Sequence, residues 1–216
     1  MTRSRLLVVL DVDSTLTRDE GIDLLAETVS SEVATEVAGI TARAMKGELD
    51  SETSLRTRVR ALEGVPLEAI EKANQRVQIT PGAKELVDTL HDLGHLVGAV
   101  SGGFHHMVDP LARTLGLDFH RANNFGVEGG LLNGEVLEPF IDAQAKEQTL
   151  RDWAHSFGVN MRDTVAIGDG GNDVMMIRAA GVGIAFMAKP VVKAVADVVI
   201  DSPDLSLVLE VLNLRP

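Results

Sequence analysis

The sequence contains no cysteine, which excludes disulfides, thiolate zinc sites and cysteine nucleophiles. It also lacks long apolar runs, since none approaches the roughly 20 residues that a membrane-spanning helix requires. What remains is a chain of 216 residues, 45% of them hydrophobic. A chain of this size buries roughly 70% of its extended surface on folding. We therefore expect it to fold around its own core, as one domain or as a core with a modest insertion.

The start of the chain superficially resembles a secretion signal, because two arginines in residues 1–5 precede the apolar run Leu6–Leu10. That run is too short for the apolar region of a signal and ends at Asp11. We interpret it as a buried strand and expect a cytoplasmic protein without a membrane partner. The net charge of -12 disfavours binding to nucleic acid, so any phosphate site must be locally cationic.

Short apolar runs alternate with amphipathic stretches along much of the chain. The runs are Leu6–Leu10, Leu96–Val100, Thr164–Ile167, Gly183–Phe186 and Val198–Ile200. The amphipathic stretches include Ala83–Leu93 and Ala143–Phe157. This alternation predicts an α/β fold, with a doubly wound and mostly parallel sheet covered by helices on both faces. In such sheets ligands bind beyond the carboxyl ends of the strands.

Residues 21–78 break the alternation, because they form several consecutive helical patterns without a strand. We interpret this segment as an inserted helical cap, and residues 1–20 and 79–216 as the α/β core. Further along, the Gly129-Gly130 turn between apolar flanks predicts a β-hairpin over Asn123–Leu137, appended to the sheet.

Two carboxylates follow the first predicted strand, where strand geometry places Asp11 and Asp13 on the same side. One of such a pair can act as nucleophile or metal ligand and the other as general acid and base. An Asx turn or a calcium loop is the alternative. The EF-hand pattern fails, because Leu16 stands where it needs Gly and Ile22 where it needs Glu.

Two further carboxylates, Asp169 and Asp173, lie among glycines after the strand Thr164–Ile167. Oxygen ligands indicate a hard cation, and a site with few carboxylates and room for phosphate and water favours Mg²⁺ over calcium. The alternative is a glycine-rich turn in which Asn172 caps the following helix.

The segment Ser101-Gly102-Gly103 ends a strand ahead of a helix, so a hydroxyl and backbone N–H groups can face an anion there. This pattern predicts a phosphate-binding loop. A serine hydrolase is the alternative, because Ala99–Gly103 is one residue short of the Gly-x-Ser-x-Gly turn, and Asp142 and His155 follow in the required order. That alternative would leave the aspartates above without a role.

Lys146 shares a helical face with three apolar residues at i+4, i+7 and i+11. These are Leu150, Trp153 and Phe157. A lysine on the buried face of a helix needs an anion, which a bound phosphate would supply. The alternative is a lysine whose ammonium reaches along that face to solvent.

One helix of the predicted cap offers a candidate ligand for a substrate carboxylate. Its apolar stripe consists of Leu55, Val59 and Leu62. Arg58 lies near the edge of the stripe, whereas Arg56 points away from it, so Arg58 is the better candidate. A salt bridge within the cap fits the spacing of Arg58 equally well. Glu20 is either a surface charge or the partner of a substrate amine.

Three histidines, His105, His106 and His120, suggest a metal site at first sight. Neighbouring histidines point apart on a helix, however, and no third ligand follows at a recognised spacing. We expect ordinary side chains.

Four segments, in this order, resemble the motifs of the haloacid dehalogenase superfamily. They are Asp11-Val12-Asp13-Ser14-Thr15, Ser101-Gly102-Gly103, Lys146 and Gly168-Asp169-Gly170-Gly171-Asn172-Asp173. The chain is most similar to the phosphoserine phosphatase branch, and this resemblance covers nearly the whole chain. It rests on Leu16, Glu20, the stretch Met45–Val59, Phe104 and the segment Ala185–Pro190.

The resemblance implies that Asp11 is the nucleophile. Asp13 would protonate the departing serine and then act as the base for water. It also implies Mg²⁺ held by Asp11, the carbonyl of Asp13 and Asp169, with Asp173 supporting the metal.

The resemblance further implies phosphate contacts from Ser101, Gly102 and Lys146, with Asn172 nearby. Glu20 and Arg58 would bind the amine and the carboxylate of phosphoserine beneath a closing cap. The regulatory extension of some relatives has no counterpart, so feedback control is not expected.

Two departures from the family pattern keep other functions open: Ser51 stands where relatives usually have Phe, and Met187 also differs. A wider pocket would suit another small phosphomonoester or phosphoryl transfer to an alcohol. A phospho-metabolite binding protein without turnover is the alternative of a different class. The expected role is the last step of serine biosynthesis, in a monomer or a homodimer.

Overall fold

The computed structural model describes residues 4–46 and 48–215. A seven-stranded sheet has the strand order β4-β3-β2-β1-β5-β6-β7. Its strands are β1 (Leu7–Leu10), β2 (Leu96–Phe104), β3 (Phe119–Glu128), β4 (Leu131–Leu137), β5 (Thr164–Gly168), β6 (Val182–Phe186) and β7 (Val198–Ile200). Every neighbouring pair is parallel except the antiparallel hairpin β3–β4. The predicted α/β fold is confirmed.

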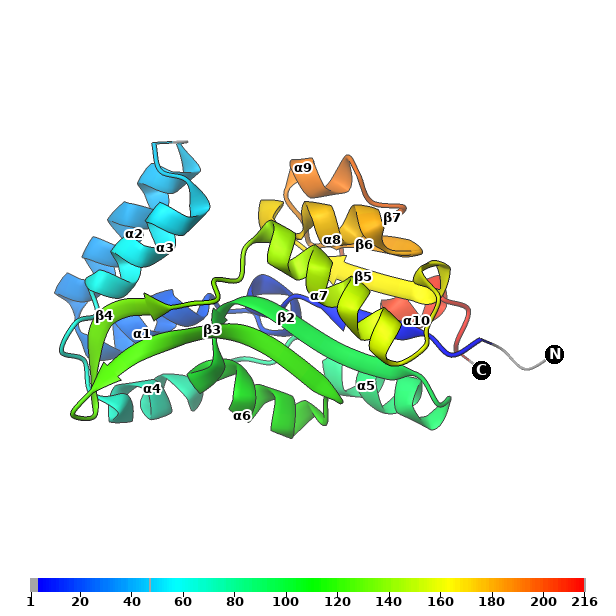
Figure 1. Ribbon diagram of the computed structural model, residues 1–216, viewed down its shortest axis with the longest axis horizontal. Coiled ribbons are helices and arrows are strands. Elements are labelled where there is room, and N and C mark those ends of the chain that lie inside the picture. Colours follow the sequence, from blue (N-terminus) through cyan, green and yellow to red (C-terminus); the bar gives the residue numbers. More distant parts are fainter. Residues whose placement is uncertain (1–3, 47, 216) are drawn as a thin grey trace.

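Helices cover both faces of this sheet, as Figure 1 shows. One face packs against α5 (Ala83–Asp92), α6 (His105–Leu115) and α10 (Leu207–Val211), and the other against α7 (Ala143–Ser156), α8 (Val174–Ala179) and α9 (Pro190–Lys193). In β1, Val8 and Leu10 face the first layer, whereas Leu7 and Val9 face the second. All four are fully buried, and each burial stabilises the fold by roughly 1.5–3 kcal/mol. Because helices cover both faces of the sheet here, every residue of β1 is apolar.

The three motif-bearing strands are neighbours at the centre of the sheet. Strand β1 pairs in parallel with β2 on one side and with β5 on the other. Parallel strands end at the same edge, so Asp11, Ser101 and Asp169 converge there.

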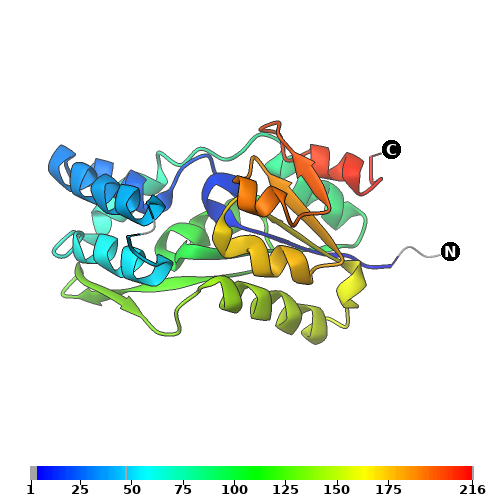
Figure 2. The same cartoon turned by 90° about the horizontal axis from the view of Figure 1, so that it is seen from above.

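Four helices lie beyond the carboxyl edge of the sheet, at the left of Figure 1, and the blue and cyan helices among them are again at the left of Figure 2. They are α1 (Gly21–Val29), α2 (Ser31–Met45), α3 (Ser51–Arg60) and α4 (Leu67–Asn74). Ser30 and Asp50 cap α2 and α3, since their side chains accept hydrogen bonds from Val33 N and Thr53 N. An apolar cluster of their own holds these helices together. Within the described residues, no helix combines the length and apolarity needed to cross a bilayer.

The predicted hairpin is present, since Asn124–Glu128 pair antiparallel with Leu131–Leu137, but its first strand begins earlier, at Phe119. The first residues of β3 pair in parallel with β2, from Gly98–Phe119 to Val100–Arg121. Its later residues pair with β4 and run among the four helices, with α2 and α3 above them and α4 below in Figure 1. Phe125 joins the apolar cluster of these helices. The hairpin is thus an extension of the sheet that both parts of the molecule share. The helices α9 and α10 were not anticipated, because four or five residues are too few to show a helical period.

Candidate active site

Lys146 lies between two buried aspartates at the carboxyl edge of the sheet. Its Nζ is 2.5 Å from Asp11 Oδ1 and 2.7 Å from Asp173 Oδ1. Lys146 and Asp173 are 0% exposed and Asp11 is 4% exposed. Burial alone would lower the pKa of Lys146, but the two carboxylates raise it well above its usual value. The ammonium is therefore retained, and the alternative of a lysine that reaches solvent is wrong.

Asp13 occupies a different environment from Asp11. Its Oδ1 accepts a hydrogen bond of 2.7 Å from Gly21 N, and its Oδ2 accepts one of 3.2 Å from Ser101 Oγ. Burial, assisted by the charge of Glu20, raises the pKa of Asp13 to about 6. A carboxyl group with this pKa can hold and release a proton near neutral pH, as a general acid and base must.

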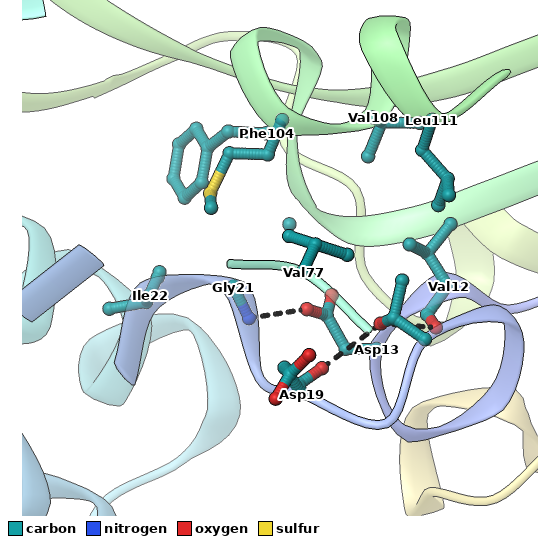
Figure 3. A pocket seen from close by; sticks show the side chains of 12 residues that line it. Val12, Asp13, Asp19, Gly21, Ile22, Val77, Phe104, Val108 and Leu111 are labelled. Carbon is teal, nitrogen blue, oxygen red and sulfur yellow. Dashed lines mark hydrogen bonds between the residues drawn. The ribbon is translucent and has the colours of Figure 1, made fainter. Parts of the chain in front are cut away.

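A cavity lies beside Asp13 and explains why that carboxyl group is poorly solvated. The cavity has about 30 Å³ of free space, and Figure 3 shows its largely apolar wall around Asp13. The wall includes Val77 from the segment that leads back to the sheet and Val108 from α6. Apolar neighbours disfavour the charged form of the carboxyl group and so favour its proton.

Three carboxylates crowd together on the other side of the site. The ligand oxygens of Asp11, Asp169 and Asp173 all lie within 4.8 Å of one another. Burial raises the pKa of Asp11 well above its usual value and that of Asp169 to about 6, and the charge of Asp173 adds to both shifts. Lys146 offsets only part of this negative charge. An all-oxygen donor set with uncompensated charge fits a hard divalent cation.

The predicted phosphate loop lies against Asp13. Ser101 Oγ accepts a hydrogen bond of 2.7 Å from Gly103 N and donates to Asp13. A Cβ atom on Gly103 would be 2.9 Å from both Asp13 Oδ2 and Ser101 Oγ, so this close approach requires glycine. A Cβ atom on Gly102 would be 3.6 Å from Asn172 Nδ2. The fold thus brings together residues of the loop and Asn172.

The serine hydrolase alternative is wrong. Ser101 is hydrogen-bonded to Asp13 and Gly103, Asp142 caps α7 through Ala145 N, and His155 is exposed. A nucleophilic serine needs a histidine within hydrogen-bonding reach.

Glu20 lies directly before the first of the four outer helices, and Arg58 lies on the third. Glu20 precedes α1, accepts a hydrogen bond of 2.8 Å from Ser14 Oγ, and raises the pKa values of Asp13 and Asp169 through its charge. Its carboxylate is therefore near the site rather than on a remote surface.

The two arginines of α3 differ in their partners. Arg56 is bound to Glu52, Glu138 and the carbonyl of Val136. Arg58 forms no such bond among the described residues, and its Nε is buried without a partner. Of the two arginines, Arg58 is the one with a donor still unfilled among the described residues, and its role as the ligand of a substrate carboxylate stays a prediction. Sequence reasoning missed Asp23, whose buried Oδ1 also lacks a partner and whose carboxyl group senses the charge of Arg58.

Two of the three histidines, His105 and His120, share Asp109 as a hydrogen-bond partner. Asp109 Oδ1 is 2.7 Å from His105 Nδ1 and 2.9 Å from His120 Nε2. Their ligand atoms lie close enough for a metal ion. However, His105 Nε2 accepts a hydrogen bond from Ala122 N, so its Nδ1 carries the proton and is not free to bind a metal. His106 turns the other way, toward Phe125, as expected for neighbours on a helix.

A family model described as haloacid dehalogenase-like hydrolase matches residues 6–181. The chain that carries these carboxylates and this lysine is therefore a hydrolase of the haloacid dehalogenase superfamily.

Similar proteins of known name and structure narrow the assignment within this superfamily. A phosphoserine phosphatase from Streptococcus thermophilus is 47% identical, over 99% of this chain and 98% of the relative. One from Methanocaldococcus jannaschii is 42% identical, over 97% and 99% of the two chains. A solved structure of a phospho-aspartyl intermediate analogue of phosphoserine phosphatase superposes with a TM-score of 0.90, at 42% identity over 97% of this chain and 99% of the other. The chain belongs to the phosphoserine phosphatase family.

Proposed function

We propose that the protein hydrolyses O-phospho-L-serine to serine and phosphate through an aspartyl-phosphate on Asp11, the last step of serine biosynthesis. The observation that carries this proposal is the contrast between two neighbouring carboxylates. Burial raises the pKa of both, but Asp11 is held by the ammonium of Lys146 within the carboxylate cluster, whereas Asp13, with a pKa of about 6, lies beside an apolar wall. The first suits a nucleophile and the second a proton carrier. The relatives are named phosphoserine phosphatases, and this supports phosphoserine as the substrate.

Residues 21–78 would act as a cap over a core made of residues 1–20 and 79–216. The four outer helices share one apolar cluster, whose buried residues in the core lie only at the end of β2 and on the hairpin, and this supports the division. The antiparallel bridge between Thr17 and Ile79 supports it too, because it joins the two strands of chain that lead into and out of the cap. Substrate would bind between the two parts, beside Asp13.

We infer that Mg²⁺ is held by Asp11, the carbonyl of Asp13 and Asp169, with Asp173 in support. The crowding of these carboxylates and their raised pKa values favour a cation there. When bound, the ion would neutralise charge on the phosphoryl group and polarise it.

The phosphoryl oxygens would be bound by Ser101, Gly102, Lys146 and Asn172. The carboxylate of Asp11 attacks phosphorus, and the bond from phosphorus to the serine oxygen breaks. Asp13 gives its proton to that oxygen. It then takes a proton from the water that attacks phosphorus, which releases phosphate and restores the Asp11 carboxylate. Such proton transfer contributes roughly 10²–10⁴-fold.

Arg58 and Glu20 would recognise the carboxylate and the ammonium of the substrate. The unpaired Arg58 supports the first role, because a guanidinium fork matches a carboxylate. A second candidate function is action on a different small phosphomonoester, including phosphoryl transfer to an alcohol. It is favoured by Ser51, the exposed first residue of α3, which stands where the family resemblance leads one to expect Phe.

The deciding experiment measures phosphate release from L-phosphoserine, phosphoethanolamine and p-nitrophenyl phosphate, each with Mg²⁺ and with EDTA. Magnesium-dependent preference for phosphoserine is expected. Activity on the other two esters but not on phosphoserine would support Asp11 as the nucleophile. It would refute the proposed binding of the substrate ammonium by Glu20 and of its carboxylate by Arg58. Phosphate binding without turnover of any ester would indicate a binding protein instead.

We further propose a cytoplasmic enzyme of small-molecule substrates, as a monomer or a homodimer. The net charge of -12 supports the absence of a nucleic-acid partner. Light scattering with size-exclusion chromatography would separate the two assembly states.

A further inference from the structure

Strands β2 and β3 lose their register where the phosphate loop begins. Val100 pairs with Arg121, but the next paired residues are Phe104 and Asn123. Residues 101–103 of β2 therefore lie opposite Ala122 alone. A bulge of this kind leaves backbone groups without ladder partners and turns them away from the neighbouring strand. The irregularity thus releases the loop from the β2–β3 ladder, and its Gly103 N–H donates to Ser101 Oγ instead.

Asn123 spans the gap that this bulge creates. Its side chain is 0% exposed and uses both ends of its amide. Nδ2 donates to Gly102 O at 2.8 Å, and Oδ1 accepts from Ile141 N at 2.8 Å. Because both partners are backbone groups of fixed polarity, the orientation of the amide is determined.

The second partner of Asn123 belongs to the chain that starts the lysine-bearing helix. Ile141 directly precedes Asp142, the N-cap of α7, and Lys146 lies in the first turns of that helix. The carbonyl of Ile141 would be 3.8 Å from a Cβ atom on Gly102, so the two segments are also in close contact. One buried amide therefore joins the phosphate loop to the element that carries Lys146.

We propose that Asn123 is a positioning residue that fixes the phosphate loop relative to Lys146 and thereby sets the geometry of phosphate binding. This rests on the phosphate-binding roles proposed above for Gly102 and Lys146. A side chain of this size must supply one donor and one acceptor at once. Aspartate lacks the donor when ionised, and leucine lacks both, so each would leave a buried backbone group unpaired.

The test compares Asn123→Asp with Asn124→Asp, an exposed neighbour that undergoes the same change of charge. With Mg²⁺ at pH 8, we measure kcat/KM per folded enzyme and the inhibition constant of inorganic phosphate. Asn123→Asp should lower kcat/KM by about 10–100-fold and weaken phosphate inhibition at least about 10-fold, because small misplacements of binding groups are costly. The loss should be equal for phosphoserine and p-nitrophenyl phosphate, and Asn124→Asp should behave as wild type.

The pH dependence of the Asn123→Asp variant separates a positioning role from a purely structural one. At lower pH the introduced carboxyl group regains a donor, so activity relative to wild type should rise. An unchanged phosphate inhibition constant in Asn123→Asp, with a loss that only follows the folded fraction, would overturn the proposal. If that variant does not fold, Asn123→Ser takes its place, since its hydroxyl is too short to reach both partners. A wild-type protein that neither turns over esters nor binds phosphate would refute the proposed function itself.

Discussion

The two ends of the proposed substrate site are built differently. At the phosphate end, Lys146 is enclosed with Asp11 and Asp173, and the polar atoms involved are hydrogen-bonded to one another. At the outer end, Arg58 Nε and Asp23 Oδ1 are buried and have no hydrogen-bond partner within residues 4–46 and 48–215.

This difference follows from what each end must do. Charge that develops on a phosphoryl group is stabilised best by groups already in place, because they need no rearrangement during the reaction. Recognition of the remaining substrate needs groups whose bonding capacity is still unfilled. Under the proposed function, the paired end would carry the chemistry common to the superfamily, and the unpaired end would carry the choice of substrate.

The largest effect is expected at the paired end, from Asp11→Asn. An amide is a poor nucleophile, so turnover should fall at least about 10³-fold on every ester, as when other catalytic groups are removed. Phosphate release measures this, and circular dichroism should show an unchanged fold. The exposed Asp92→Asn serves as the control. An active Asp11→Asn enzyme would exclude the aspartyl-phosphate mechanism.

At the unpaired end, Arg58→Ala should discriminate between substrates. We expect kcat/KM for phosphoserine to fall about 10–100-fold, because a charge-assisted bond to the carboxylate is lost. Activity on phosphoethanolamine, which has no carboxylate, should barely change. Arg56→Ala is the matched control, since Arg56 is already bound to Glu52 and Glu138. Equal losses on both substrates would remove the distinction between the two ends.

Gly103→Ala should disturb the paired end without unfolding the protein. The added methyl group would press on Asp13 Oδ2 and Ser101 Oγ, so we expect roughly 10-fold lower kcat on all esters. Gly39→Ala on the exposed side of α2 meets no atom within 4 Å and should instead stabilise the fold by up to about 1 kcal/mol. Wild-type kcat in Gly103→Ala would show that the loop tolerates the displacement.

The smallest expected effect is a pH dependence of stability without metal. The pKa values of Asp13 and Asp169 are raised to about 6, so the folded state keeps protons that the unfolded chain has lost above pH 4. Their contribution to the free energy of unfolding is complete below pH 4 and is lost as the pH rises through 6. In EDTA, Asp13→Asn should therefore gain melting temperature relative to wild type between pH 4 and 7. Added Mg²⁺ should raise the melting temperature of wild type most near pH 7, where these carboxyl groups are ionised. If the difference in melting temperature between Asp13→Asn and wild type did not change with pH, the raised pKa of Asp13 would be contradicted.

Much of the phosphate end was predictable because its signals are local. The unbroken apolar sequence of β1 indicates a strand buried on both faces, and the carboxyl ends of parallel strands converge. The spacing of Lys146 with Leu150 predicts its burial. Asn123 escaped notice because nothing in its own neighbourhood distinguishes it from Asn124, which is exposed. Its role depends on the backbone of two segments distant in the sequence.

By itself, the sequence determined the parallel sheet, the order of the chemical groups along the chain and the edge at which they meet. Periodicity and strand direction are sufficient for these, since both depend on neighbouring residues. Only the tertiary structure decided that Arg56 is bound and Arg58 is not, that Asp13 lies beside an apolar cavity, and that Asn123 joins two loops. Hydrogen-bond partners and local dielectric are properties of the packed chain, because they are set by residues that only folding brings together.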